Sequence, residues 1–374
     1  MRAGYYQEQL EGYKAFIPAD LPPNPPIDMD SELVSLLSSA DRCLGRLDGA
    51  TSVLPNPDLF VAMYVRQEAV LSSQIEGTQS TLEDVLEFEI DEQGNEHPKD
   101  VQEVVNYISA MNYGLQRLNE LPLCLRLIRE IHQKLLDGVR GSDRSPGEFR
   151  KSQNWIGHEG CNLKTASFIP PPLAQMHQAL DNLEKFIHYN TNLPVLIQCG
   201  LIHAQFETIH PFLDGNGRVG RLLITFLLCQ KGILQRPLLY LSYYLKAHRQ
   251  EYYDVLMNIR TNGDWEGWLK FFLRGVYEVS QTATNTAQNI LKLQQNHRQL
   301  ISQQSGGSNN SLLLLDLLFT QPIVNINLVQ THLNSSYNTA KKTVDHFIQL
   351  GLLTEITGYQ RNRRYRYDPY LALF

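Results

Sequence analysis

The sequence contains few of the features that mark secreted or membrane proteins. Its 374 residues include only five cysteines, which are scattered along the chain at Cys43, Cys124, Cys161, Cys199 and Cys229. Their spacing gives neither a disulfide framework nor a zinc site, and it favours reduced thiols. No apolar run approaches the roughly 20 residues that a bilayer requires, and no signal peptide is visible at the N-terminus. We therefore expect a cytoplasmic protein with no membrane partner.

The chain also lacks a strong excess of either charge. Lys and Arg number 33 against 39 Asp and Glu, which gives a net charge of -6. A surface of this kind does not attract polyanions as a whole, so any contact with nucleic acid must be local. Hydrophobic residues make up 43% of the chain, as in ordinary globular proteins, and its length allows two or three domains.

The most informative stretch reads His-Pro-Phe-Leu-Asp-Gly-Asn-Gly-Arg-Val-Gly-Arg and spans residues 210–221. An apolar run at 222–228 follows at once, which predicts a loop leading into a buried helix. Glycines at 215, 217 and 220 allow tight turns whose N–H groups point inward. The first turn of the following helix adds unpaired N–H donors, so the stretch is suited to bind an anion.

The side chains of this stretch suit the phosphates of a nucleotide. Arg218 and Arg221 lie about one helical turn apart and can reach the same polyanion. Asp214 is suited to hold a divalent cation against phosphate oxygens, and His210 has the ordinary pKa of a general base near neutral pH. The alternative of a calcium loop would need oxygen ligands where the two arginines stand.

The whole string resembles the signature of the Fic family, His-Pro-Phe-x-[Asp/Glu]-Gly-Asn-Gly-Arg-x-x-Arg, and the resemblance extends over about residues 57–275. It implies a protein adenylyltransferase, which transfers AMP from ATP to a Ser, Thr or Tyr hydroxyl of a protein target, itself included. It further implies ATP as substrate, Mg²⁺ held by Asp214, and His210 as the catalytic base. The residues implied to bind ATP are Gly215, Asn216, Gly217, Arg218, Val219, Gly220, Arg221, Tyr252 and Tyr253.

A second motif lies upstream, at the end of a helix predicted from about Pro57 to Gly77. It reads Ser72-Ser-Gln-Ile-Glu76-Gly77, and its plain interpretation is a helix end stopped by glycine. The carboxylate of Glu76 faces the unfavourable end of the helix dipole, which indicates another partner. The motif resembles the [Ser/Thr]-x-x-x-Glu-[Gly/Asn] inhibitory motif of Fic proteins. This resemblance implies that Glu76 pairs with Arg221 and hinders the γ-phosphate.

Residues 141–172 are rich in glycine and proline and predict a short β-hairpin, with a surface loop as the alternative. The stretch resembles the Fic flap, with Gly-Glu-Phe-Arg leading in and Ile-Pro-Pro leading out. The resemblance implies that the flap holds the target by strand addition. The residues implied to line the nucleotide and the target are Thr165, Ala166, Ser167 and Phe168.

The last part of the chain resembles a winged helix-turn-helix. Helical spacing at 312–319, 326–333 and 339–350 precedes an arginine-rich ribbon at 361–368. Six Lys and Arg against four Asp and Glu make residues 311–374 mildly basic, so both DNA and protein docking stay open.

The chain as a whole is expected to be mostly α: a Fic helical core with a β-hairpin flap, plus a C-terminal winged helix-turn-helix domain. The expected units are an N-terminal arm and helices with the inhibitory helix at 1–110, the Fic catalytic core at 111–280, a connecting helix and linker at 281–310, and the winged-helix domain at 311–374. Two alternatives to AMP transfer stay open, namely a DNA-binding regulator whose Fic core senses nucleotide and a Fic enzyme that removes AMP from its target. Homodimer formation also stays open.

Overall fold

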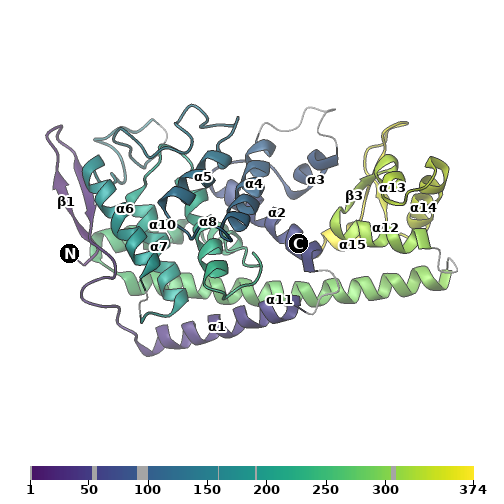
Figure 1. The fold of residues 1–374 in the computed structure, drawn as a ribbon, viewed down its shortest axis with the longest axis horizontal. Helices are drawn as coiled ribbons and strands as arrows, with labels where there is room; N and C mark the ends of the chain where they lie inside the picture. Colours follow the sequence, from purple (N-terminus) through teal and green to yellow (C-terminus); the bar gives the residue numbers. More distant parts are fainter. Residues whose placement is uncertain (1, 53–56, 91–99, 159, 190–191, 305–308) are drawn as a thin grey trace.

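The structure is a computed structural model that describes residues 2–52, 57–90, 100–158, 160–189, 192–304 and 309–374. The described part is mostly helical and elongated, with small antiparallel sheets toward its two ends (Figure 1). The helices up to the signature are α1 (Ser31–Ser52), α2 (Pro57–Ile75), α3 (Leu82–Ile90), α4 (Val101–Arg117), α5 (Leu125–Leu135), α6 (Leu173–His188) and α7 (Val195–Ile209). Those that follow are α8 (Asn216–Gln230), α9 (Ser242–Ala247), α10 (Arg249–Asn262) and α11 (Trp265–Gln304).

Helices α7 and α8 form the centre of the core. Residues 196–209 of α7 are all buried, as are residues 218–228 of α8. Apolar residues occur all round these helices because neighbouring helices cover every face. The loop that joins them, residues 210–215, is therefore fixed between two immobilised helix ends.

Helix α11 runs along the length of the molecule and joins its two ends (Figure 1). The end of the expected Fic core at 111–280 and the expected connecting helix that begins at 281 are thus parts of one continuous helix. Helix α1 packs along it, and the C-terminal elements pack near its far end (Figure 1). Of the expected connecting helix and linker at 281–310, residues 305–308 lie outside the described residues, and α12 already begins at Asn309. The sequence at 91–100 is acidic and rich in turn-forming residues, which predicts a loop, and all of it but Asp100 also lies outside them.

The sequence of residues 1–30 is polar and rich in proline toward its end, which predicts an extended arm, and this prediction is wrong for its first part. β1 (Gly4–Glu8) and β2 (Lys14–Pro18) form an antiparallel hairpin with Gly4 opposite Pro18. The side chains of residues 15–17 are buried, and Gly12 adopts a φ of +79° in the turn. Burial of Phe16 against Phe168 of the flap fixes the hairpin, a tertiary contact that the local sequence does not reveal.

The flap is less regular than predicted. In the described residues of 141–172 a single antiparallel bridge joins Ile156 and Phe168, and turns occupy most of the intervening segment. Strand β2 continues the pairing, because the N–H of Phe16 donates to the carbonyl of Ile169 at 2.9 Å. The N-terminal hairpin thus supplies the regular strands that the flap lacks.

The C-terminal segment contains four helices and a small sheet. Its elements are α12 (Asn309–Thr320), β3 (Ile323–Asn325), α13 (Ile326–His332), α14 (Tyr337–Gln349), β4 (Thr354–Glu355), β5 (Arg364–Arg366) and α15 (Asp368–Leu371). The sheet order is β3-β5-β4, with both pairs antiparallel. Side chains of Asn325 and Ser336 cap α13 and α14. No helix in the described ranges is both long and apolar enough to cross a membrane.

Candidate active site

The signature loop is held by hydrogen bonds within itself and by stacking. His210 ends α7 with a left-handed backbone, φ 49° and ψ 60°. The side-chain amide of Asn216 donates to the carbonyl of Phe212 and accepts from its N–H, both at 2.8 Å. The ring of Phe212 is fully buried and stacks on His132 with centroids 3.7 Å apart. Phe212 is thus an apolar anchor for the loop.

The flap segment also supports this loop. Buried Arg150 donates from Nε to the carbonyl of His210 at 3.1 Å. The amide of Asn154 donates to the carbonyls of His210 and Phe212 at 3.1 and 2.9 Å. Because these donors fix the backbone on both sides of Pro211, they orient the imidazole of His210.

The glycines of the signature do two different things. Only Gly215 needs positive φ, at +78°, whereas Gly217 and Gly220 are helical residues of α8. A Cβ at Gly217 would lie 2.3 Å from Oε1 of Glu76, and one at Gly220 would lie 2.4 Å from Oε1 of Glu207. The expectation that all three glycines turn the backbone is therefore wrong for 217 and 220. These two glycines let carboxylates approach the helix closely.

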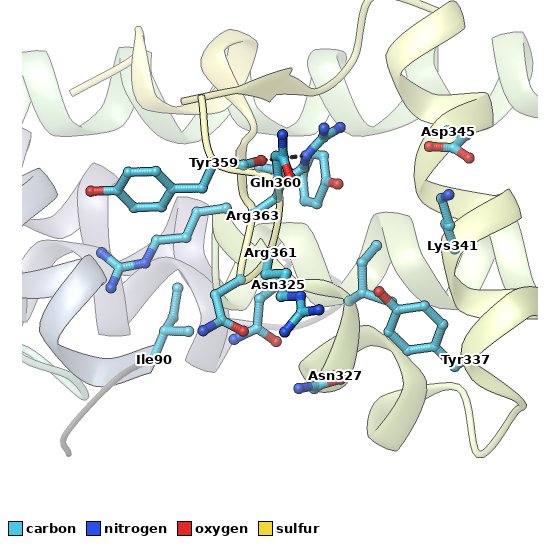
Figure 2. A pocket seen from close by; sticks show the side chains of 14 residues that line it. Ile90, Asn325, Asn327, Tyr337, Lys341, Asp345, Tyr359, Gln360, Arg361 and Arg363 are labelled. Atoms are coloured by element: carbon cyan, nitrogen blue, oxygen red, sulfur yellow. Dashed lines mark hydrogen bonds between the residues drawn. The ribbon is translucent and has the colours of Figure 1, made fainter. Parts of the chain in front are cut away.

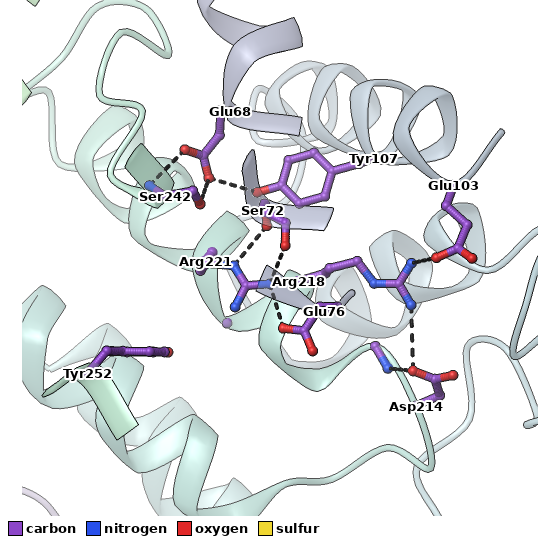
Figure 3. A network of polar contacts seen from close by, with 12 residues as sticks. Glu68, Ser72, Glu76, Glu103, Tyr107, Asp214, Arg218, Arg221, Ser242 and Tyr252 are labelled. Carbon is purple, nitrogen blue, oxygen red and sulfur yellow. Dashed lines mark hydrogen bonds and ion pairs between the residues drawn. The ribbon is translucent and has the colours of Figure 1, made fainter. Parts of the chain in front are cut away.

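Arg221 is bound by the inhibitory motif (Figure 3). Its Nε donates to Oγ of Ser72 at 2.8 Å, and one terminal nitrogen donates to the carbonyl of Ser72 at 2.9 Å and to Oε1 of Glu76 at 2.7 Å. Burial by itself raises the pKa of Glu76, but the guanidinium of Arg221 outweighs it and holds that pKa below its usual value. Glu76 is therefore ionised at neutral pH. Gly77 follows with φ +99°, which ends the helix.

Arg218 pairs with two carboxylates (Figure 3). One terminal nitrogen lies 3.0 Å from Oε2 of Glu103 on α4, and the other lies 3.5 Å from Oδ1 of Asp214. The side chain is 1% exposed, and its Nε has no hydrogen-bond partner among the described residues. Both arginines of the signature thus lie near the start of α8. Arg218 is neutralised by Glu103 and Asp214, and Arg221 is neutralised by Glu76.

His210 is kept neutral by its surroundings. Burial, followed by the positive charges of Arg260 and Arg150, lowers the pKa of His210 to about 3. Its Nδ1 is buried without a hydrogen-bond partner in the described part of the chain. An unprotonated imidazole is the form that can accept a proton.

A buried carboxyl on α2 fixes the inhibitory helix (Figure 3). Glu68 accepts hydrogen bonds from the N–H and Oγ of Ser242 at 3.0 and 2.5 Å and from the hydroxyl of Tyr107 at 3.1 Å. Burial raises the pKa of Glu68 to about 7. These bonds connect α2 to α4 and to the start of α9. Glu76 therefore projects from a docked helix and not from a loose segment.

Glu207 is a further buried carboxyl that the sequence reading missed. It lies on α7 against Gly220, and its Oε1 has no hydrogen-bond partner among the described residues. Burial raises the pKa of Glu207 to about 7, and the nearby charge of Arg221 opposes this rise. The Phe-Glu-Thr-Ile sequence before His210 looks like core helix, so the pattern alone gives no sign of this group.

The other predicted site residues lie on α8, on α10 and in the flap. Tyr252 is buried, and its hydroxyl lies 2.9 Å from Nε2 of His203, whose Nδ1 lies 2.9 Å from the carbonyl of Gly220. Tyr253 is 40% exposed, and Val219 is a buried core residue. In the flap, residues 165–167 lie toward the surface, while Phe168 is buried under Arg260 at 3.9 Å from its ring centroid. The nucleotide and target contacts of these residues stay predictions.

Asp214 is the predicted metal ligand. Its Oδ1 accepts a hydrogen bond from the N–H of Gly215 at 2.5 Å, and its side chain is 35% exposed. Its main-chain carbonyl lies 3.0 Å from Nε2 of His132, a residue that the sequence reading also missed. No group of three or more His, Cys, Asp or Glu suited to hold a metal occurs in the described residues. A single accessible carboxylate fits Mg²⁺ that receives its other ligands from phosphates and water.

Fold and site together define a helical protein with an anion-binding loop at the start of a buried helix. Two family descriptions match this chain: the Fic/DOC family N-terminal domain over residues 34–116 and the Fic/DOC family domain over residues 122–228. The chain thus carries both domains of the Fic/DOC family, as the signature at 210–221 indicated.

Three similar proteins bear the name protein adenylyltransferase. The chain is 29% identical over 196 residues to a probable protein adenylyltransferase of Aquifex aeolicus, covering 51% of this chain and 56% of that one. It is 30% identical over 179 residues to protein adenylyltransferase Fic of Aedes aegypti, covering 45% of this chain and 31% of that one. The match to the Drosophila willistoni protein of the same name is 28% identical over 176 residues, 44% of this chain and 31% of that one. The match thus spans between 31% and 56% of these relatives' lengths.

Solved structures share the fold. A Fic family protein of Desulfovibrio desulfuricans aligns with a TM-score of 0.58 at 20% identity, covering 91% of this chain and 97% of that one. A Fic domain containing signaling protein of Bacteroides thetaiotaomicron aligns with a TM-score of 0.52 at 18% identity, covering 69% and 97%. The mostly helical Fic fold is therefore confirmed.

Proposed function

We propose that this chain transfers AMP from ATP to a Ser, Thr or Tyr hydroxyl of a protein target, including itself, and that Glu76 restrains the transfer. The observation that carries the proposal is the arrangement at α8. Two buried guanidinium groups, Arg218 and Arg221, stand beside an anion-binding loop that begins with a neutral histidine. The carboxylates now on these arginines occupy places suited to phosphate oxygens.

The roles of the site residues follow from their chemistry. The target hydroxyl oxygen attacks the α-phosphorus, its proton passes to the imidazole of His210, and the bond between the α-phosphorus and the bridging oxygen breaks to release pyrophosphate. N–H groups at Gly215 and Gly217 stabilise charge on the α-phosphate, where one well-placed donor contributes roughly 3 kcal/mol. Arg218 holds the leaving pyrophosphate and Arg221 the γ-phosphate. Asn216 supports this cradle chiefly by holding Phe212.

Magnesium would have Asp214 as its protein ligand in this proposal. Asp214 would hold Mg²⁺ against the phosphates, and the ion would supply charge neutralisation at the leaving group. The ring of Tyr253, which is partly exposed, is available to contact the adenine base. Residues Thr165 to Phe168 would hold the target segment beside the nucleotide.

The restraint by Glu76 depends on the docking of α2. A shift from about 1% to 99% active requires roughly 5.5 kcal/mol, more than one ion pair contributes. The hydrogen bonds at Glu68 and Ser72 add to the buried apolar face of α2, which supplies the remainder. Glu76 itself prevents the γ-phosphate from reaching Arg221.

ATP labelled at either the α- or the γ-phosphate tests the transfer. We expect the Glu76→Gly variant to acquire covalent label from the α-phosphate only, and Glu76→Gly combined with His210→Ala to acquire none. Label from the γ-phosphate would indicate a kinase-type transfer and would contradict the proposal. Release of AMP from a previously labelled target by wild type, without net labelling by any variant, would favour the alternative of AMP removal.

A further inference from the structure

A groove of about 720 Å³ lies between the C-terminal segment and Ile90 at the end of α3, apart from the signature loop (Figure 2). One wall is the face of α14 that carries Tyr337, Lys341 and Asp345, spaced four residues apart. The other wall is the loop between β4 and β5, where Arg361 and Arg363 are exposed. The groove therefore lies between an exposed helix face and an arginine-bearing ribbon.

The lining of this groove is cationic and rich in hydrogen-bond donors. Three exposed cationic side chains, Lys341, Arg361 and Arg363, face one acidic side chain, Asp345. Guanidinium and ammonium groups bind phosphate oxygens, and an exposed helix fits the major groove of B-DNA, which is about 12 Å wide. This helix and ribbon favour duplex DNA over an acidic peptide, since both can contact the backbone of one duplex at once.

Two acidic side chains of α3 pair with arginines of β5 beside this groove. Arg364, which lines the groove, pairs with Glu87 of α3 at 2.5 Å, and its neighbour Arg366 on β5 pairs with Glu83 at 2.8 Å. The two glutamates stand one helical turn apart and occupy the arginines as phosphates would. Arg366 also binds Asp368, so Glu83 is one of its two acidic partners.

Helix α3 is also tied to the inhibitory helix. Glu89 of α3 accepts two hydrogen bonds from Arg66 of α2, at 2.9 and 2.8 Å. Helix α2 carries Ser72 and ends one residue before Glu76. At the C-terminus, the ring of Phe374 packs against Tyr64 of α2 with centroids 5.6 Å apart.

We propose that this groove binds duplex DNA, and that its phosphates displace Glu83 and Glu87 from β5, loosening the helix pair that presents Glu76 to Arg221. The effect on Glu76 rests on the proposed function, whereas DNA binding does not. The affinity of the groove is accordingly lower in the resting chain than in a chain without these two glutamates.

Fluorescence anisotropy with a labelled duplex of mixed sequence, using the full chain, tests the DNA site. We expect Arg361→Ala combined with Arg363→Ala to weaken binding roughly tenfold and to reduce the slope of log K against log salt by about 2. Glu83→Gln combined with Glu87→Gln should strengthen binding several-fold. Arg42→Ala combined with Arg126→Ala removes two exposed arginines from α1 and α5 and should leave binding unchanged.

Two outcomes would overturn the DNA site. One is equal duplex binding by all of these variants and wild type. The other is binding of polyglutamate, but not duplex DNA, at Arg361 and Arg363, which would assign the groove to an acidic protein partner. Thermal unfolding curves verify that the exposed substitutions leave the fold intact.

A second measurement tests the link to Glu76. Duplex DNA should raise self-labelling of wild type and leave self-labelling of the Arg361→Ala, Arg363→Ala chain unchanged. Duplex binding that leaves wild-type labelling unchanged, while Glu76→Gly labels strongly, would overturn the link. If Glu76→Gly itself fails to label, the proposed function fails, and the anisotropy result still decides whether the groove binds DNA.

Discussion

Glu207 and Glu68 are buried carboxyls near Arg221, and their environment gives stability a pH dependence. The pKa of each is raised by burial to about 7, so the folded chain binds their protons more tightly than the unfolded chain does. The stability that this contributes is fully present below the usual pKa of 4.5 and is lost as pH rises through about 7.

Replacement of Glu207 tests this dependence. Glu207→Gln keeps the shape of the uncharged carboxyl but cannot ionise. The fall in Tm between about pH 5 and pH 8 should therefore be smaller than in wild type. The rise in the pKa of Glu207 corresponds to a loss of roughly 3 kcal/mol in the free energy of unfolding. Scanning calorimetry across this range measures the effect. The exposed Glu11→Gln substitution is the matched control and should follow wild type. Parallel curves for Glu207→Gln and wild type would contradict the assignment.

Ser72 tests the inhibitory contact independently of the carboxylate. Ser72→Ala removes the acceptor of Nε of Arg221 and leaves the contacts to the Ser72 carbonyl and to Glu76. The loss of one buried hydrogen bond costs on the order of 1–3 kcal/mol, so self-labelling should lie between that of wild type and that of Glu76→Gly. Initial rates of labelling from the α-phosphate measure it. A Ser72→Ala chain as silent as wild type would show that Glu76 acts alone.

The sequence predicted individual residues well where a motif carried several of them together. The predicted pairing of Glu76 with Arg221 agrees with the contact seen. The sequence does not indicate the site roles of Glu207, Glu103 and His132. Each lies in an ordinary helix and contacts the site only through tertiary folding. The turn predicted at Gly217 is wrong, because a sequence motif does not distinguish a glycine within a helix from a glycine in a turn.

At the scale of elements, the loop between α7 and α8 depends on the flap segment that crosses it. Asn154→Ala removes two donors to the carbonyls of His210 and Phe212. In the Glu76→Gly background, kcat should fall roughly tenfold or more, because small displacements of a catalytic base are costly. Asn119→Ala, which removes an exposed amide that donates to the carbonyl of Gln116, is the control. An unchanged kcat for Asn154→Ala would exclude this positioning role.

Helices were predictable because their apolar spacing is local, and most observed bounds differ by only a few residues from those expected. Strands were not. The hairpin of β1 and β2 depends on contact between Phe16 and Phe168, and the flap keeps one bridge where a hairpin was expected. The prediction divided helix α11 because its sequence becomes more polar beyond Val276, yet the helix runs through Gly275 without a break and contains no proline.

At the scale of the whole molecule, α3 joins the C-terminal segment to the inhibitory helix. Glu89→Gln weakens the contact with Arg66 and leaves the pairs of Glu83 and Glu87 with β5 in place. We expect duplex binding close to wild type but weaker stimulation of self-labelling by DNA. Anisotropy and labelling on the same preparation measure both. Full stimulation in Glu89→Gln would show that another contact, such as that between Tyr64 and Phe374, transmits the effect.

The comparison that tests the account most directly is the initial rate of self-labelling from the α-phosphate of ATP in wild type, Glu76→Gln and Glu76→Gly, at matched thermal stability. If the glutamate occupies the γ-phosphate position on Arg221, Glu76→Gly should label far faster than wild type and Glu76→Gln should lie between them. Equal rates in all three chains would show that the contact between Glu76 and Arg221 does not restrain the enzyme.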